Sequence, residues 1–108
     1  MDELLKNAEE FLESGNDNLK KQRFNASVSD YFKTIVILCD YIIYKEIKVM
    51  PKNHNERFSL LGKYFKNIYE EVSQLFKIYI KFYNLRLDNK DAETLKNYAD
   101  KFKNNIPN

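Results

Sequence analysis

Turn-forming residues and cysteine are scarce in this sequence. Its 108 residues include two glycines, Gly15 and Gly62, and two prolines, Pro51 and Pro107. A β-sandwich or barrel needs turn residues at many connections, so this scarcity favours a few long helices. Cys39 is the only cysteine, which excludes an intramolecular disulfide and a thiolate metal cluster within one chain. A lone thiol is typical of a reducing compartment, and we therefore expect a cytoplasmic protein.

Strong net charge and long apolar runs are also lacking. The formal net charge is +2, and the lysines are spread along the chain, which does not indicate nucleic-acid binding by charge alone. The longest nearly apolar run, 35–43, contains Asp40 and is less than half of a membrane span. The sequence begins with an acidic amphipathic stretch, unlike the basic start of a signal peptide. We expect no membrane association.

Apolar residues are plentiful and regularly spaced. Hydrophobic residues make up 44% of the chain and aromatic residues 15%, enough for one packed core. The length suits a single domain over 1–108. Apolar positions recur every three or four residues from 3 to about 21, and the pattern passes through Gly15, so we expect one continuous helix there.

Further helices are expected along the rest of the chain. Asn25 is placed to cap a second helix that runs to about residue 47. Asn53, three residues before Glu56, is placed to cap a short third helix, which is followed by a break near 62–67 and a long fourth helix. Asp88, three residues before Asp91, is placed to cap the last one. The fold expected is an all-α, up-and-down antiparallel bundle of four long helices plus one short helix.

Asp40 is the residue that conflicts with its surroundings. It interrupts the apolar segment TIVILCDYIIY, where an unpaired carboxylate would be costly to bury. One interpretation is a structural pair with a lysine or arginine on another helix, or a position facing a solvated groove. The other is a functional carboxylate in a polar pocket or at a dimer interface.

His54, Arg57 and Arg86 are further candidates. His54 lies at the start of the expected third helix, as a residue that stabilises the helix start or as a proton carrier, with Arg57 one turn along the same face available for an anion. Arg86 is expected to end the fourth helix beside Tyr83, as a C-terminal cation or as a bidentate ligand of a carboxylate or phosphate. Cys39 is expected in the core, and the scattered His, Cys and acidic residues predict no metal site and no cofactor.

The order of these segments resembles the HEPN domains of prokaryotic nucleotidyltransferase partners and ribonuclease toxins. The resemblance covers nearly the whole chain. It is carried by the 26–44 helix with its acidic residue Asp40, by the Pro51-x-x-His54 loop, and by the aromatic helix that ends in YNLR. It implies a cytoplasmic helical bundle that dimerises through two-fold related helices, with a polar cleft along the interface.

Catalytic members of that family use this cleft to cut RNA. They carry an arginine followed after four to six residues by a histidine, aided by a carboxylate on the second helix. In this chain Asp40 matches the carboxylate and Arg86 stands for the arginine. However, no histidine follows His54, and positions 91 to 93 read Asp-Ala-Glu. RNA cleavage would therefore lack an evident proton donor or base.

Three hypotheses follow. The first is a non-catalytic, homodimeric HEPN-like module that engages a partner protein, such as a nucleotidyltransferase of toxin-antitoxin type, or a nucleotide or RNA. The second is a metal-independent RNase with a rearranged site built from the catalytic candidates His54, Arg57, Arg86 and Asp40. The third is a helical scaffold whose aromatic surface binds another helix. The candidate ligand-binding residues are Asp40, Tyr44, Asn53, His54, Arg57, Tyr83 and Arg86.

Overall fold

The computed structural model describes residues 2–106, and these residues form helices without a strand, as the sequence predicts. The elements are α1 (Asp2–Lys20), α2 (Phe24–Ile47), α3 (His54–Tyr64), α4 (Lys66–Ile80), the short 3-10 helix η1 (Lys81–Tyr83) and α5 (Asn89–Asn104). α1 continues through Gly15, as expected. Within this part of the chain, no helix combines the length and the apolar character needed to cross a bilayer.

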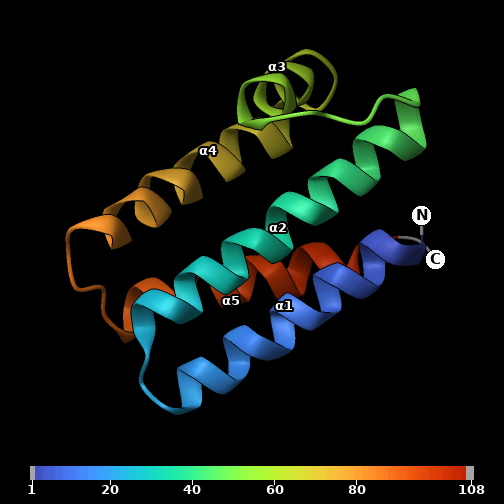
Figure 1. Cartoon of the computed structure of the whole chain (residues 1–108). Helices are drawn as coiled ribbons and strands as arrows, with labels where there is room; N and C mark the ends of the chain where they lie inside the picture. The colour runs from blue at the N-terminus through green and yellow to red at the C-terminus, as the bar shows by residue number, and fades with distance from the viewer. Residues whose placement is uncertain (1, 107–108) are drawn as a thin grey trace.

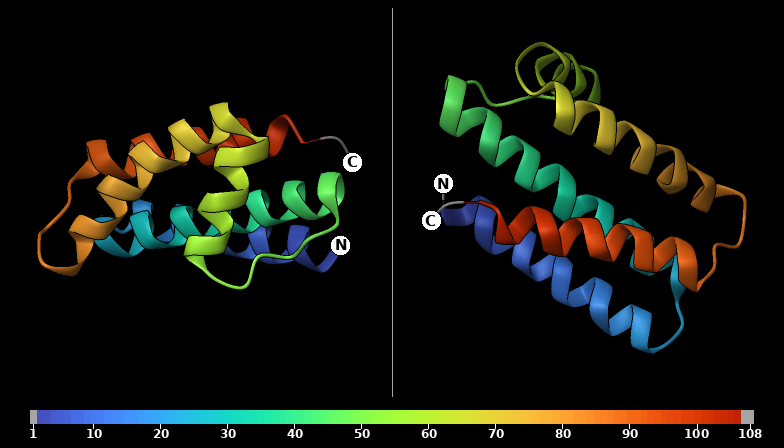
Figure 2. Two further views of the ribbon diagram at one scale, coloured as in Figure 1. Left: turned by 90° about the horizontal axis from the view of Figure 1, so that it is seen from above. Right: turned by 180° about the vertical axis from the view of Figure 1, so that it is seen from behind.

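α2 is the central element. It makes its most extensive contacts with α1 and α5, and it also contacts α3 and α4. Figure 1 shows α1 and α2 as an antiparallel pair with α4 on the other side of α2, and the view from behind in Figure 2 shows α5 between α1 and α2. α3 crosses the end of this arrangement rather than running along it. The chain thus forms a tight trio of α1, α2 and α5, with α3 and α4 packed on one side of α2.

The core follows the long apolar stretch of α2. Its completely buried large side chains include Tyr31, Phe32, Ile35, Leu38 and Ile43. Neighbouring helices cover several faces of α2, which explains why this helix is apolar nearly all round. Among the described residues, every buried side-chain nitrogen and oxygen has a hydrogen-bond partner.

The starts of α3 and α5 are set by side-chain caps. Asn53 accepts a hydrogen bond from the Glu56 backbone N–H at 2.8 Å, and Asp88 and Asp91 form a reciprocal capping box at the start of α5. Both caps were expected from the sequence. They fix where α3 and α5 begin, and the first of them positions the residues of the candidate site.

Asn25 does not cap α2, in contrast to our expectation. The helix begins at Phe24 without a side-chain cap bond, and Asn25 lies inside the first turn. Its amide instead donates to the carbonyl oxygens of Phe82 at 3.2 Å and Leu85 at 2.8 Å, and its Oδ1 accepts from the Leu87 N–H at 2.8 Å. Asn25 therefore anchors the connection between α4 and α5 to the start of α2.

Candidate functional site

Asp40 is buried and paired with Arg57. The Arg57 Nε donates to Asp40 Oδ1 at 2.7 Å, and Nη2 donates to Oδ2 at 2.9 Å. The two residues are only 9% and 8% exposed. A bidentate contact of this kind satisfies both carboxylate oxygens and makes the buried charge tolerable. Of the two interpretations of Asp40, the structure shows the ion pair with an arginine of another helix.

The position of Arg57 follows from the start of α3. The Asn53 cap begins the helix at His54, and Arg57 lies three residues later on the same face as His54. That face is turned toward α2, so that Arg57 reaches Asp40 while His54 remains at the surface. The first turn of α3, residues 54–57, is therefore held against α2 by the contact of Arg57 with Asp40.

His54 shares the guanidinium of Arg57. The Arg57 Nη1 lies 2.8 Å from His54 Nδ1. Because a guanidinium has only donors, Nδ1 must accept this hydrogen bond, and the proton of the neutral ring is on Nε2. Partial burial lowers the pKa of His54, and the positive charge of Arg57 lowers it further, while the negative charge of Asp40 opposes both effects. At neutral pH the ring is uncharged and offers an N–H group at Nε2.

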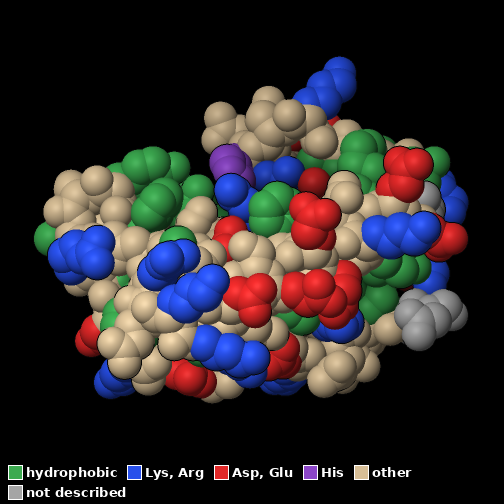
Figure 3. Space-filling view, turned by 60° about the horizontal axis from the view of Figure 1, so that its bottom comes forward, with side chains coloured by type: hydrophobic (Ala, Val, Ile, Leu, Met, Phe, Trp, Pro, Cys, Tyr) green, Lys and Arg blue, Asp and Glu red, His purple; other side chains and the backbone are tan. Residues whose placement is uncertain are grey.

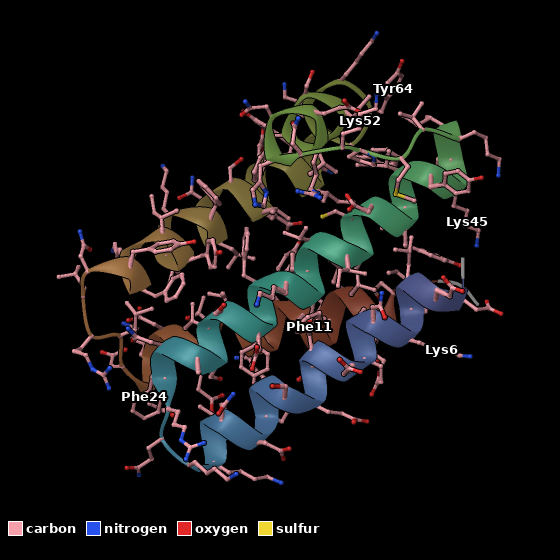
Figure 4. All side chains as sticks on the ribbon, in the orientation of Figure 1. Lys6, Phe11, Phe24, Lys45, Lys52 and Tyr64 are labelled. Carbon is pink, nitrogen blue, oxygen red and sulfur yellow. The ribbon has the colours of Figure 1, made fainter. Side chains whose placement is uncertain are left out.

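A groove lies beside this pair. Its volume is about 370 Å³. It is lined by Phe11, Phe32, Lys33, Val36, Ile37, Asn53, His54, Arg57 and Tyr79. Figure 3 shows the histidine, in purple, at the edge of a hollow with basic and hydrophobic side chains beside it, and Figure 4 shows Phe11 between α1 and α2. The groove therefore combines an apolar floor with a polar edge at the start of α3.

Aromatic rings form one wall of the groove. The rings of Phe32 and Tyr79 are stacked with centroids 4.4 Å apart, and Phe76 packs against both. The hydroxyl oxygens of Tyr79 and Tyr83 lie 3.3 Å apart. The pKa of Tyr79 is raised to about 12, mainly because the ring is partly buried and also because of this hydrogen bond. Tyr79 thus remains protonated at neutral pH and acts as an apolar wall with a polar tip.

Arg86 is not part of this cluster. α4 ends at Ile80, so Arg86 lies in the loop after η1 and not at the end of the fourth helix as expected. The loop is held to Asn25 on α2 through the Leu85 carbonyl. Asn25 lies fifteen residues before Asp40, so at 1.5 Å per helical residue the two positions are about 22 Å apart along α2. Arg86 is exposed and makes no salt bridge with any residue of the 2–106 range. Within one chain, Arg86 and Asp40 do not meet.

The other candidates occupy different places. Asn53 and His54 line the groove. Tyr44 is half-buried in the last turn of α2, with the Lys48 ammonium 5.8 Å from its ring centroid. Tyr83 is 70% exposed at the end of η1. Cys39 is buried in the core, which raises the pKa of its thiol, and no cluster of three metal-ligating residues occurs among those described.

Lys33 is the charged groove residue that the sequence analysis did not single out, and the apolar residues of the groove were not singled out either. A signal for it exists in the helical spacing. Lys33, Ile37 and Asp40 stand at i, i+4 and i+7, so they share one stripe of α2. The helical spacing of α2 therefore already predicts, from the sequence, that Lys33 lies on the same face as Asp40.

Comparison with known proteins gives no assignment: no family model matches the chain, and no curated protein or solved structure is significantly similar to it.

Proposed function

We propose that this protein is a non-catalytic, HEPN-like helical binding module that acts as a homodimer. It engages a partner protein, such as a nucleotidyltransferase of toxin-antitoxin type, or a nucleotide or RNA. The contact between Arg57 and His54 Nδ1 is the main support for a binding role without catalysis. That contact occupies the basic lone pair of the ring and leaves an N–H donor at Nε2, which suits binding of an acceptor group.

The geometry of Asp40 and Arg57 supports the same proposal. RNA cleavage without a metal needs a base for the ribose hydroxyl and an acid for the leaving group. Both oxygens of Asp40 are engaged by Arg57, and the pair is buried. Releasing either residue for catalysis would leave a buried charge unpaired, at a cost of about 3–5 kcal/mol.

The proposal also includes the finer description of the fold and its setting. An up-and-down antiparallel bundle of four long helices plus one short helix is supported by the reversals of chain direction from α1 to α2 and from α2 to α4 (Figure 1). A cytoplasmic location is supported by the lone, buried Cys39. Both belong to the resemblance on which the proposal rests.

Light scattering at micromolar concentration tests the dimer. The chain mass is 13.0 kDa, so a homodimer has twice that mass, about 26 kDa. We expect the dimer mass across the micromolar range, because a module that binds through a two-fold interface must remain associated at working concentration. A strictly monomeric protein would count against the proposal.

A second candidate is a metal-independent RNase with a rearranged site. The observation that favours it is the hydrogen-bonded chain from Asp40 through Arg57 to His54, which ends at the groove. Incubation with total RNA, beside a His54→Ala variant and an Arg86→Ala variant, separates the two functions. The binding module predicts the same background cleavage in all three samples. Cleavage by the wild type that is lost with His54→Ala would support the RNase instead.

A further inference from the structure

The polar side chains that line the groove mainly offer hydrogen-bond donors. Lys33 contributes an ammonium, and His54 contributes its Nε2–H because Nδ1 is occupied by Arg57. Asn53 Oδ1 accepts from the Glu56 N–H, which leaves its amide N–H groups available. A ligand that satisfies these groups must present acceptors.

The charge of the groove is a single positive one. The charge of Arg57 is balanced by Asp40, whereas Lys33 makes no salt bridge with any residue in 2–106. The Lys33 ammonium instead lies 5.2 Å from the centroid of the Phe11 ring. No aspartate or glutamate lines the groove. This charge complements one carboxylate better than a chain of phosphates.

The floor of the groove is apolar and comes from three helices. Phe11 belongs to α1, Phe32, Val36 and Ile37 belong to α2, and Tyr79 belongs to α4. The volume of about 370 Å³ accommodates one or two bulky side chains. The aromatic rings of the groove are able to stack bases, but the groove has one cation for phosphates and no lining carboxylate for the N–H groups of bases, which disfavours RNA as the occupant.

We propose that this groove binds a segment of a partner protein in which a glutamate or aspartate side chain is flanked by bulky apolar side chains. The carboxylate pairs with Lys33, backbone carbonyl groups of the segment accept from the N–H groups of Asn53 and His54, and the apolar side chains cover Phe11, Val36 and Tyr79. This inference rests on the proposed binding function and names the chemistry of the partner.

The test uses a blocked pentapeptide in which glutamate is flanked by leucine and phenylalanine, titrated into the ¹⁵N-labelled protein. We expect saturable amide shifts at the groove residues. The matched glutamine peptide should bind about three- to tenfold more weakly, as expected for loss of a charge-assisted contact at a partly exposed site. Equal affinity of the two peptides, no saturable shifts, or shifts confined to another surface would overturn the proposal. A single-stranded RNA oligonucleotide that shifts the groove residues where the glutamate peptide does not would also overturn it.

Variants assign the preference to Lys33. In Lys33→Gln, the difference in affinity between the glutamate and glutamine peptides should shrink to less than about twofold, because the groove has lost its unpaired cation. Lys6→Gln is the matched control on α1, since Lys6 is exposed and does not line the groove (Figure 4). An undiminished difference in Lys33→Gln, or the same reduction in Lys6→Gln, would contradict the role of Lys33.

The outcome is separable from that of the proposed dimer. Light scattering reports association of the chain, whereas the peptide titration reports the groove of one subunit. A dimer that does not distinguish the peptides overturns the inference alone. A monomer that prefers the glutamate peptide overturns the homodimer and supports the chemistry of the groove.

Discussion

A carboxylate in the middle of an apolar helix is tolerated here because its partner is an arginine with fixed geometry. Arg57 meets both oxygens of Asp40 and uses a third nitrogen for His54. The desolvation of two buried charges offsets much of their attraction, so such a pair contributes little net stability compared with apolar side chains of similar volume. The main effect of the pair is to fix the position of α3 against α2.

Replacement of one or both partners tests this balance. We expect Arg57→Met to lower the free energy of unfolding by about 3–5 kcal/mol, because Asp40 would remain buried and unpaired. The double variant Asp40→Leu/Arg57→Met should recover most of that loss. Urea unfolding measures both. A double variant as unstable as the single one would show that the pair itself supplies the stability.

The stability of the protein should depend on pH through His54. Partial burial and then the charge of Arg57 hold the pKa of His54 below its ordinary value of 6.5, so the unfolded chain binds the proton more readily. The contribution of the neutral ring is present above pH 6.5 and is lost as the pH falls from there through the lowered folded pKa. We expect the free energy of unfolding to fall over that range, and less so in His54→Gln.

The titration of His54 can also be followed directly by NMR. Wild-type His54 should titrate below 6.5 and show the Nε2–H tautomer when neutral. Arg57→Met removes a positive neighbour and should raise the pKa of His54 relative to the wild type. A pKa that does not move in this variant would contradict the contact with Arg57.

At the level of elements, the contact between α1 and α2 depends on a close approach at Gly15. A Cβ atom there would lie 2.7 Å from the Cδ1 and Cε1 atoms of Tyr31. The Tyr31 ring is fully buried and its hydroxyl donates to Asn16 Oδ1 at 2.6 Å, so it has little freedom to move away. Ser27 Oγ donates to the Gly15 carbonyl at 3.0 Å across the same contact. Glycine is required here for packing between helices.

Alanine at the two glycines should therefore have opposite effects. Gly15→Ala gains about 1 kcal/mol in helix propensity but overpacks Tyr31, at about 1–3 kcal/mol, so we expect a net loss of stability. Gly62→Ala on α3 meets Tyr69 at an ordinary 3.5 Å and should gain up to about 1 kcal/mol. Urea unfolding of both variants measures the difference. Stabilisation of similar size at both positions would contradict the overpacking argument.

Local chemistry made the helices predictable, and distant contacts made part of the site unpredictable. Asn53 and Asp88 bond to residues three positions away, so their capping roles are legible in the sequence. Asn25 is the same kind of residue before the same kind of segment, yet its partners are 57 to 62 residues away. The sequence identified Asp40 as needing a partner, but only the packing of α3 on α2 selects Arg57.

At the level of the whole molecule, the helices differ in how firmly they are held. α1, α2 and α5 share the most extensive contacts, whereas α3 and α4 each bury few side chains. Leu61 and Arg57 are the buried residues of α3, and Val72 and Leu75 are those of α4. Regions with few buried contacts open at lower free energy than the core. The pair of Arg57 and Asp40 is one of the links between these two parts.

Native-state hydrogen exchange should reveal this difference. We expect the amides of α3 and α4 to exchange through a partial opening of lower free energy than that of α2, because separating them exposes less apolar surface than global unfolding does. Arg57→Met should lower the opening free energy of α3 and α4 more than that of α1 and α5, whereas Leu12→Ala, which opens a cavity against α2, should act mainly on α1 and α2. Identical exchange free energies in all five helices would mean that the bundle opens as one unit and that the groove beside His54 persists until the whole domain unfolds.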